Sequence, residues 1–226
     1  MRSHPPFHEA RLIAFDNDGT LYPAGLEVAA AVLEAHRDFV AQNDLGIQTP
    51  DADWVRNLIG ADALDFFGAM MPGQPEHVRQ EFELFCTEYE AAAVARFSQL
   101  YEHVEELLHG LVASGKTLVL ISNGTPRYVE CIWDSCNYAR WFTASYPFAS
   151  PENLHKGQRL VQAMDRYGAP AVMVGDRRSD HEAARHAGTW FIGCAYGYGE
   201  SHEIEGADAT AHSVDQLFEL LLACKV

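Results

Sequence analysis

Residues 11–21 read RLIAFDNDGTL, an apolar run that ends in two aspartates separated by one asparagine. Residues 11–16 have the length and composition of a short buried strand. Aspartate is a poor strand former and is costly to bury unpaired, so Asp16 and Asp18 mark the end of the strand. Two aspartates at such a position indicate that their carboxylates have a function. Residues i and i+2 of an extended chain face the same side, so both carboxylates can share one cavity, and Gly19 lets the backbone turn away.

Strand-like runs alternate with helix-like runs through most of the remaining chain. Further strands are predicted at residues 117–123, 143–148, 171–176 and 190–197. The run TLVLISN from Thr117 is continuously apolar, as expected for a strand that is buried on both faces. Helix starts are predicted at Thr125-Pro126, at Ser179 with Glu182, and at Ser213 with Gln216. This alternation predicts an α/β fold with a doubly wound parallel sheet that is covered by helices on both faces.

One segment breaks the alternation, because residues 23–97 contain helical patterns and no convincing strand. Apolar side chains recur there with a helical period, and Thr49-Pro50-Asp51 is typical of a helix start. The periodic positions are Leu26, Ala29, Leu33 and Val40 in one stretch and Val78, Phe82, Phe85, Tyr89 and Ala92 in another. We therefore expect an all-helical domain at residues 23–97, inserted after the first strand of a core domain made of residues 1–22 and 98–226.

Composition limits the classes of function. The chain has 226 residues, 48% of them hydrophobic, and a formal net charge of −16. Such a charge argues against a sequence-independent nucleic-acid binder, which needs Lys and Arg to neutralise phosphates. The sequence shows neither a signal peptide nor an apolar run long enough to span a membrane, and its five scattered cysteines fit reduced thiols. We expect a cytoplasmic monomer or homodimer with no nucleic-acid or membrane partner.

Polar residues stand where the predicted strands end and where the following helices begin. In a parallel sheet, ligands bind beyond the carboxyl ends of the strands. These positions therefore bring four carboxylates, a hydroxyl, an amide and an ammonium towards one rim of the sheet. The residues are Asp16, Asp18, Ser122, Asn123, Lys156, Asp176 and Asp180.

Such a group of side chains suits phosphate chemistry. Several carboxylates in one place repel each other unless a cation joins them, and oxygen ligands select a hard ion, most simply Mg²⁺. Mg²⁺, the Lys156 ammonium, the Ser122 hydroxyl and backbone amides near Asn123 can neutralise a phosphoryl group while a carboxylate attacks it. A second carboxylate can then protonate the leaving oxygen and later deprotonate a water.

Each of these residues also has an ordinary structural interpretation. Asp18 alone is typical of an Asx turn, Asp180 alone of a carboxylate at a helix N-terminus, and Lys156 alone of a solvated surface lysine. Their coincidence, in chain order and at the matching strand ends, favours the functional interpretation, because long motifs in context are more specific than single matches.

The stretches FDNDGTL, ISNG, HKG and VGDRRSD, in that order, resemble the four motifs of the haloacid dehalogenase superfamily. The resemblance covers most of the chain, and residues 23–97 resemble the helical first-type cap of that superfamily. It implies a phosphatase in which Asp16 is the nucleophile that forms an aspartyl-phosphate and Asp18 is the general acid and base. Ser122 would bind the phosphate, and Lys156 would neutralise charge.

The same resemblance implies a Mg²⁺ site. Its ligands would be the carboxylates of Asp16 and Asp176, the backbone carbonyl of Asp18 and, directly or through water, Asp180. Thr20, Asn123 and Gly124 are expected to help bind the phosphate or the substrate. Those three residues, with the cap, would complete the site.

The motifs KG, GDRRSD and the late YGYG resemble the branch that contains phosphoglycolate phosphatases and 5′-nucleotidase-like members. This implies a small phosphorylated metabolite as substrate, either phosphoglycolate-like or a nucleoside monophosphate. The cap segment WVRNLIG, residues 54–60, resembles segments in which an arginine approaches the substrate. Arg56 is therefore the candidate for substrate selection, and a solvated helix position is its alternative interpretation.

Two other functions use the same residues. A sugar phosphomutase shares the aspartyl-phosphate chemistry but passes the phosphoryl group to a sugar, and a receiver-like protein takes up phosphate as a signal without turnover. The helical cap argues against the second, because a lid suits the exclusion of water during turnover. A dehalogenase is disfavoured, since displacing a halogen needs neither a proton donor at Asp18 nor Mg²⁺.

Overall fold

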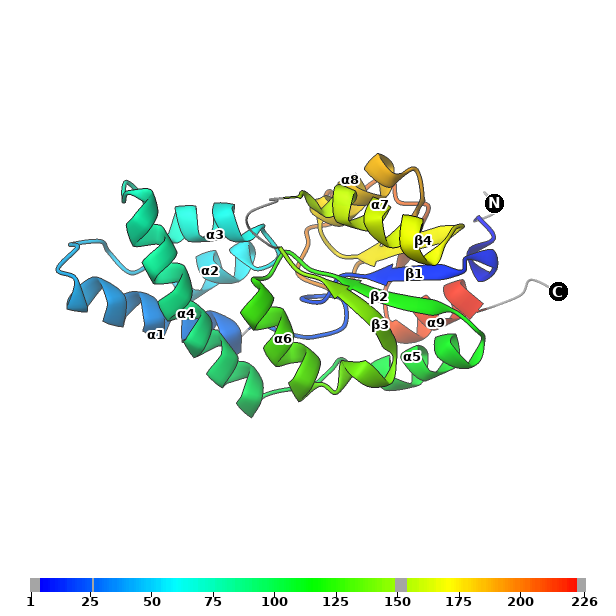
Figure 1. Ribbon diagram of the computed structural model, residues 1–226, viewed down its shortest axis with the longest axis horizontal. Helices are drawn as coiled ribbons and strands as arrows, with labels where there is room; N and C mark the ends of the chain where they lie inside the picture. The colour runs from blue at the N-terminus through cyan, green and yellow to red at the C-terminus, as the bar shows by residue number, and fades with distance from the viewer. Residues whose placement is uncertain (1–4, 26, 149–153, 223–226) are drawn as a thin grey trace.

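The computed structural model describes residues 5–25, 27–148 and 154–222. Six parallel strands form a sheet with the order β3-β2-β1-β4-β5-β6 (Figure 1). The strands are β1 (Leu12–Phe15), β2 (Thr117–Ile121), β3 (Phe142–Tyr146), β4 (Ala171–Gly175), β5 (Trp190–Cys194) and β6 (Ala209–Ala211). The five predicted strands are confirmed. The sixth, Ala209–Ala211, was missed because three residues are too few to show a periodicity.

The register of the sheet fixes which residues meet at its edge. Phe15 lies beside Leu120 of β2 and Val174 of β4. The residues that follow these three positions therefore leave the sheet together, at the carboxyl ends of the strands. Strand order reverses between β1 and β4, and such a switch point is where open α/β sheets bind their ligands.

Helices cover both faces of the sheet, as predicted. On one face lie α7 (Lys156–Tyr167) and α8 (Arg178–Ala187), and on the other lie α5 (Val104–Ala113), α6 (Pro126–Ser135) and α9 (Val214–Leu222) (Figure 1). The side chains of β1 alternate between the two layers: Leu12 and Ala14 pack with α7 and α8, whereas Ile13 and Phe15 pack with α5, α6 and α9. All four are fully buried, which explains the continuously apolar strand.

Four helices lie between β1 and α5 and extend beyond the strand ends as a separate lobe (Figure 1). They are α1 (Glu27–Gln42), α2 (Ala52–Leu58), α3 (Ala63–Met70) and α4 (Glu76–Arg96). The described residues between 23 and 97 contain no strand. Phe82 contacts both Phe39 and Phe67 in the lobe's core, and α4 packs on both α1 and the core helix α6. Leu26, one of the periodic positions, lies outside the described residues.

The helix ends match most of the predicted signals. Thr125 caps α6 by accepting a hydrogen bond from the Tyr128 amide, Asp51 caps α2, and the Ser213 hydroxyl accepts one from the Gln216 amide. The predicted start at Ser179 with Glu182 is wrong, because α8 begins at Arg178. The Asp180 carboxylate accepts a hydrogen bond from the Arg177 amide at 2.9 Å, so the first turn is capped two residues earlier than predicted.

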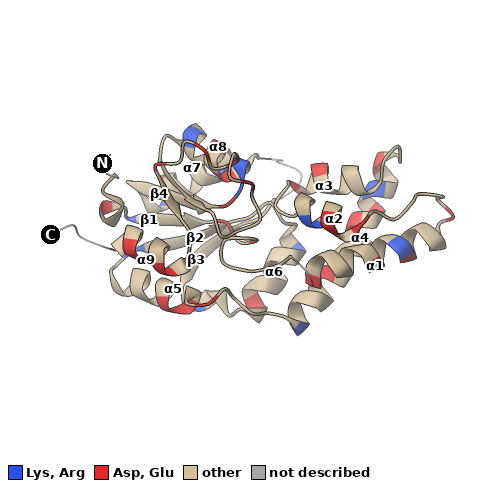
Figure 2. Cartoon of the chain, turned by 180° about the vertical axis from the view of Figure 1, so that it is seen from behind, with Lys and Arg blue, Asp and Glu red and all other residues tan. Residues whose placement is uncertain are grey.

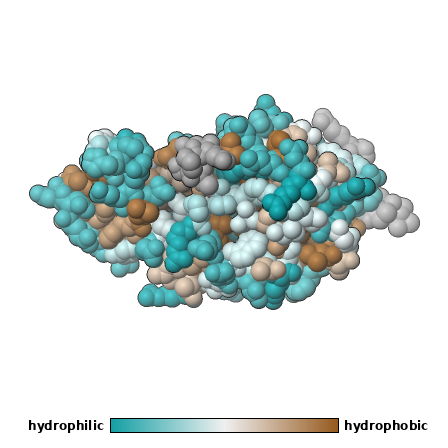
Figure 3. Space-filling view, in the orientation of Figure 1, coloured by the Kyte–Doolittle hydropathy of each residue, from teal (hydrophilic) through white to brown (hydrophobic). Residues whose placement is uncertain are grey.

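The surface reflects the acidic composition. Figure 2 shows acidic residues on helices of both the sheet part and the four-helix lobe. On the face seen in Figure 3, hydrophobic residues form separate patches among hydrophilic ones. None of the helices in the described ranges combines the length and apolar character that a bilayer crossing requires. Four of the cysteines are free thiols, and the fifth, Cys224, lies outside those ranges.

Candidate active site

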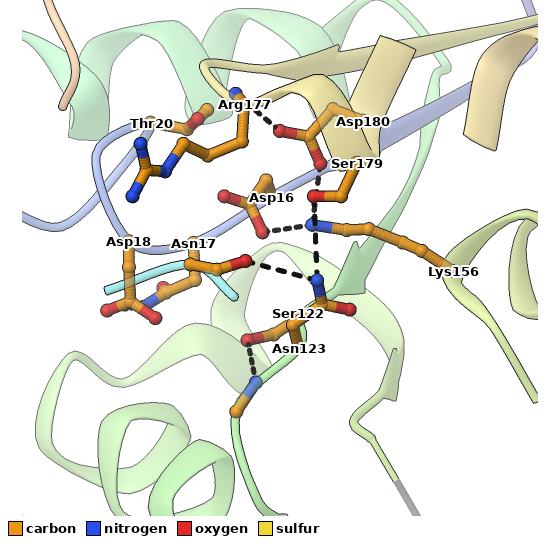
Figure 4. A network of polar contacts seen from close by, with 12 residues as sticks. Asp16, Asn17, Asp18, Thr20, Ser122, Asn123, Lys156, Arg177, Ser179 and Asp180 are labelled. Carbon is orange, nitrogen blue, oxygen red and sulfur yellow. Dashed lines mark hydrogen bonds and ion pairs between the residues drawn. The ribbon is translucent and has the colours of Figure 1, made fainter. Parts of the chain in front are cut away.

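The strand ends bring the predicted polar residues into one buried group (Figure 4). The side chains come from the ends of β1, β2 and β4 and from the first turns of α7 and α8. Each of the six is at most 6% exposed: Asp16, Asp18, Ser122, Lys156, Asp176 and Asp180. Charged side chains are rarely buried to this extent unless they are paired or bind a ligand. These residues are therefore candidates for a ligand-binding or catalytic site.

Lys156 lies between two carboxylates. Its ammonium nitrogen is 2.5 Å from Oδ1 of Asp16 and 2.6 Å from Oδ1 of Asp180, and all three side chains point toward one another in Figure 4. Burial alone lowers the pKa of Lys156, but the two carboxylates together raise that pKa above its ordinary value. The lysine therefore stays protonated and keeps a positive charge beside Asp16.

Three carboxylates form an oxygen-rich cluster. Oxygen atoms of Asp16, Asp176 and Asp180 lie within 4.8 Å of one another. Burial is the main reason that the pKa values of Asp176 and Asp180 are raised, and the negative charge of Asp16 raises both further. A hard divalent cation would remove this repulsion, and a set of carboxylate oxygens is the donor set that such a cation prefers.

The Asp18 carboxylate is not part of that cluster and has partners of its own. The Tyr128 hydroxyl donates a hydrogen bond to its Oδ1 at 2.7 Å, and the Asn17 amide donates another at 3.1 Å. Burial, and then the charge of Asp16, raise the pKa of Asp18 to about 7. A carboxyl group in this range can give and take a proton near neutral pH, which is what a general acid and base requires.

Backbone amides hold Asp176 in place. Its Oδ2 accepts hydrogen bonds from the amides of Tyr198 and Gly199, at 2.7 and 3.0 Å, and the Thr20 hydroxyl donates to Oδ1 at 3.4 Å. Gly19 has a φ of +85°, and a Cβ atom there would lie 2.4 Å from Asp176 Oδ2. The turn after Asp18 therefore needs glycine both for its backbone conformation and for the space beside the carboxylate.

We expect Gly19→Ala to impair the site more than the fold. A positive φ disfavours alanine by roughly 1–2 kcal/mol, and the new methyl group would also displace Asp176. Gly73→Ala is the matched control, because Gly73 has a φ of +73° with nothing within 4 Å of its Cβ position. Chemical denaturation should show similar losses of unfolding free energy for both variants. Phosphate release, the activity that the sequence predicts, should fall about a hundredfold in Gly19→Ala alone, and equal activities would contradict this account of Gly19.

The predicted phosphate-binding residues lie at the same rim. The Ser122 hydroxyl accepts a hydrogen bond from the Gly124 amide at 3.1 Å. The Asn123 side chain instead joins the two parts of the molecule: its amide donates to the Gly60 carbonyl of the lobe at 3.1 Å, and its oxygen accepts from Arg159 at 2.6 Å. Asn123 therefore fixes the position of the lobe above the site.

Arg177 makes a second connection between the sheet part and the lobe. Its guanidinium donates to the Ile59 carbonyl from Nε at 3.1 Å and to the Asn57 carbonyl from a terminal nitrogen at 2.5 Å. It also pairs with Glu203 at 2.9 Å. The loop that ends α2 is thus bound through its backbone to the residue that follows Asp176.

We expect Arg177→Gln to weaken the seating of the lobe. Glutamine is too short to reach both carbonyls, and hydrogen bonds from a charged donor contribute about 1.5–3 kcal/mol each. The value of kcat/KM for phosphomonoesters should fall about tenfold, chiefly through a higher KM. Arg178→Gln removes the same charge from an exposed neighbour and should have no such effect. Equal kinetics in the two variants would show that the Arg177 contacts do not serve the site.

The structure does not place Arg56 at the site, which corrects the expectation for that residue. Its side chain is 40% exposed and forms an ion pair with Asp53 on its own helix. It lines a separate hollow with Tyr101 and Tyr198. The segment itself does reach the site, but through Ile59 and Gly60, because α2 ends before them and turns Arg56 the other way.

A cavity lies between the rim of the sheet and the lobe. Asp16, Asp18 and Ser122 form its floor, and α3, α4 and the loop after α2 supply its roof. Its volume is about 50 Å³. About 10–15 Å³ holds one water-sized group, so the cavity has room for a few heavy atoms.

Four residues of the site were missed from the sequence: Arg159, Tyr128, Arg177 and Glu90. Arg159 had a detectable signal, because it follows Lys156 by three residues on a helix and so shares its face. Glu90 had another, since it continues the buried series Phe82 and Cys86 at a spacing of four. Tyr128 and Arg177 act across long sequence separations that no local pattern reveals.

Comparison with known proteins identifies the class. The haloacid dehalogenase-like hydrolase family matches residues 10–188, and a related HAD-hydrolase-like family matches residues 158–220. The chain belongs to the haloacid dehalogenase-like hydrolase family. Within it, the chain is an enzyme of the phosphatase class.

Relatives match the chain over nearly its whole length. The phosphoglycolate phosphatase of Vibrio vulnificus (strain YJ016) is 30% identical over 224 residues, which are 95% of this chain and 97% of that protein. The phosphoglycolate phosphatase of Yersinia pseudotuberculosis is 31% identical over 220 residues, covering 91% of this chain and 88% of that protein. A predicted phosphoglycolate phosphatase from Haemophilus somnus has a similar fold, with a TM-score of 0.80, 22% identity and coverage of 93% and 97%.

Proposed function

We propose that this enzyme is a Mg²⁺-dependent phosphomonoesterase that acts on a small phosphorylated metabolite through an aspartyl-phosphate at Asp16. One observation carries the proposal: Asp16 belongs to a buried cluster of carboxylate oxygens and also pairs with a buried lysine. An anionic phosphoryl group can approach a carboxylate only where positive charge offsets the negative charges of both groups. The buried lysine, and a cation in the carboxylate cluster, would supply that positive charge at Asp16. The names of the relatives support the same reaction class.

The donor set fits Mg²⁺. The carboxylates of Asp16, Asp176 and Asp180 would hold the ion, together with the backbone carbonyl of Asp18. Bound there, the ion would neutralise charge on the phosphoryl oxygens. Asp176 is already oriented by two amides, so little rearrangement is needed for it to serve as a ligand.

The first chemical step forms the intermediate. A carboxylate oxygen of Asp16 attacks phosphorus, the bond from phosphorus to the ester oxygen breaks, and Asp18 gives its proton to the leaving alkoxide. Lys156 and the Ser122 hydroxyl offset the charge on the phosphoryl oxygens. The pKa of Asp18, raised to about 7, supports this role, because the carboxyl group can then exchange a proton near neutral pH.

The second step releases phosphate. Asp18, now a carboxylate, takes a proton from water, and the resulting hydroxide oxygen attacks phosphorus of the aspartyl-phosphate. The bond from phosphorus to the Asp16 oxygen breaks, which restores both aspartates.

We also propose that residues 23–97 form a cap domain on a core of residues 1–22 and 98–226. The cap would exclude bulk water and admit the leaving group through the cavity beneath it.

Inorganic phosphate release is the test of this function. The purified enzyme with Mg²⁺ should hydrolyse p-nitrophenyl phosphate and a subset of phosphorylated metabolites, including phosphoglycolate and nucleoside monophosphates as comparison esters. Formation of a sugar phosphate isomer without phosphate release would identify a phosphomutase instead. Stoichiometric uptake of a phosphoryl group without turnover would identify a receiver-like protein.

A further inference from the structure

One acidic side chain in the cavity has no part in the mechanism above. Glu90 lies on α4, is 8% exposed and lines the cavity together with Asp16 and Asp18. Among the described residues, none donates a hydrogen bond to its carboxyl group or forms an ion pair with it. A buried carboxyl group without a partner is costly, and a ligand in the cavity can supply that partner.

The rest of the roof is apolar. Val28, Ile59, Ala63, Phe66 and Phe67 line the cavity, and the described lining residues include no lysine, arginine or histidine. A carboxylate or second phosphate on the leaving group would therefore be desolvated there without a cation. Such a leaving group is therefore disfavoured.

The cations near the cavity already have partners. Lys156 is held between two carboxylates, and Arg177 by two carbonyls and Glu203. Arg159 lines a neighbouring hollow on the α7 side, but it donates to the carbonyls of Tyr146 and Leu154 and to the Asn123 side chain. Neither of these arginines is among the described residues that line the cavity above Asp16.

We propose, on the basis of the phosphatase function given above, that Glu90 selects the substrate. The leaving group that enters the cavity is small and carries a hydrogen-bond donor, either a hydroxyl or an ammonium group. The cavity rejects a leaving group that carries a carboxylate or a second phosphate. The substrate class is thus a small phosphorylated polyol or amino alcohol, which differs from the substrate in the relatives' names.

The electrostatics of Glu90 agree with this class. Burial, followed by the negative charges of Asp18 and Glu83, raises the pKa of Glu90 to about 8. In its protonated form the group can both accept a hydrogen bond from a hydroxyl and donate one to it. An ammonium group would favour the ionised carboxylate and form an ion pair with it.

A matched series of esters tests the proposal. The compounds are ethyl, 2-hydroxyethyl and 2-aminoethyl phosphate and phosphoglycolate, which differ in one terminal group, with the three-carbon homologues alongside. Phosphate release is measured with Mg²⁺ for the wild type, Glu90→Gln, Glu90→Leu and the control Glu81→Gln. Glu81 lies on the same helix but is exposed and does not line the cavity. Circular dichroism checks that each variant is folded.

We expect the wild-type kcat/KM for the hydroxyl or the ammonium ester to exceed that for phosphoglycolate at least about tenfold, the effect of one hydrogen bond. Glu90→Leu should lose this preference, with a smaller loss on ethyl phosphate than on the hydroxyl and ammonium esters, whereas Glu81→Gln should match the wild type. A preference for the hydroxyl ester that survives in Glu90→Gln indicates a neutral leaving group. A preference for the ammonium ester that falls about tenfold in Glu90→Gln indicates a cationic one.

Two results would overturn the inference while leaving the phosphatase function intact. One is wild-type hydrolysis of phosphoglycolate at least as efficient as that of the hydroxyl and ammonium esters. The other is an equal loss on all four esters in Glu90→Leu. Failure to release phosphate from every ester, and from p-nitrophenyl phosphate, would overturn the proposed function and this inference with it.

Discussion

Replacing Asp16 by asparagine should reduce phosphate release by at least about ten-thousandfold while leaving the protein folded. The amide has nearly the same shape as the carboxylate, so packing at the end of β1 is preserved, but it is too weak a nucleophile to form the acyl-phosphate. The fold should tolerate the change, because Lys156 keeps its ion pair with Asp180. One of three mutually repelling carboxylates is also removed.

The control is Asp134→Asn, the same substitution on the exposed face of α6. It should retain full activity, and thermal unfolding should show that Asp16→Asn is at least as stable as the wild type. Rapid acid quench of the wild type with ³²P-labelled ester should trap label on the protein, and Asp16→Asn should trap none. Activity of Asp16→Asn within about tenfold of the wild type would exclude Asp16 as the nucleophile.

Removal of Mg²⁺ should have the second largest effect. Enzyme treated with EDTA and then freed of the chelator should lose at least about a thousandfold in kcat/KM, because the phosphoryl charge then faces uncompensated carboxylates. Mg²⁺ should restore the rate. Ca²⁺ should restore little of it, since it takes more ligands at longer distances and would hold Asp16 in a poor position for attack.

A readout that does not depend on turnover accompanies that experiment. A cation that binds only the folded protein raises its stability, by about 2.7 kcal/mol at a hundred times the dissociation constant. The melting temperature should therefore rise with Mg²⁺ in the wild type and rise much less in Asp176→Asn. An undiminished rate after EDTA treatment, with no response of the melting temperature to Mg²⁺, would show that the carboxylate cluster does not hold a metal.

The part of the site that lies on the sheet was largely predictable from the sequence. Asp16, Ser122 and Asp176 each follow an apolar strand, and Lys156 and Asp180 each open a helix, so local signals located them all. Parallel pairing then required these positions to meet at one edge. The roles given to these side chains remain predictions that the two experiments above address.

The part of the site that belongs to the lobe could not be predicted in the same way. Its position depends on contacts such as that of Arg177 with Ile59, 118 residues apart, and on the packing of α4 against α6. Helical periodicity gave the existence of these helices but not the rotation of α2, which turns Arg56 away from the cavity. Helical periodicity also identified one apolar face of α4, but it did not identify the adjacent buried face that carries Glu90.

The adjacency of Asp176 and Arg177 has a consequence for how this enzyme can evolve. Asp176 belongs to the carboxylate cluster, and Arg177 donates a hydrogen bond to the loop after α2. A single peptide unit therefore links the position of the lobe to the cluster. If the cluster holds the proposed cation, substitutions selected for faster exchange of substrate would alter affinity for that cation as well. Adaptation to new substrates is therefore expected in the roof of the cavity, where a change in one side chain leaves this linkage untouched.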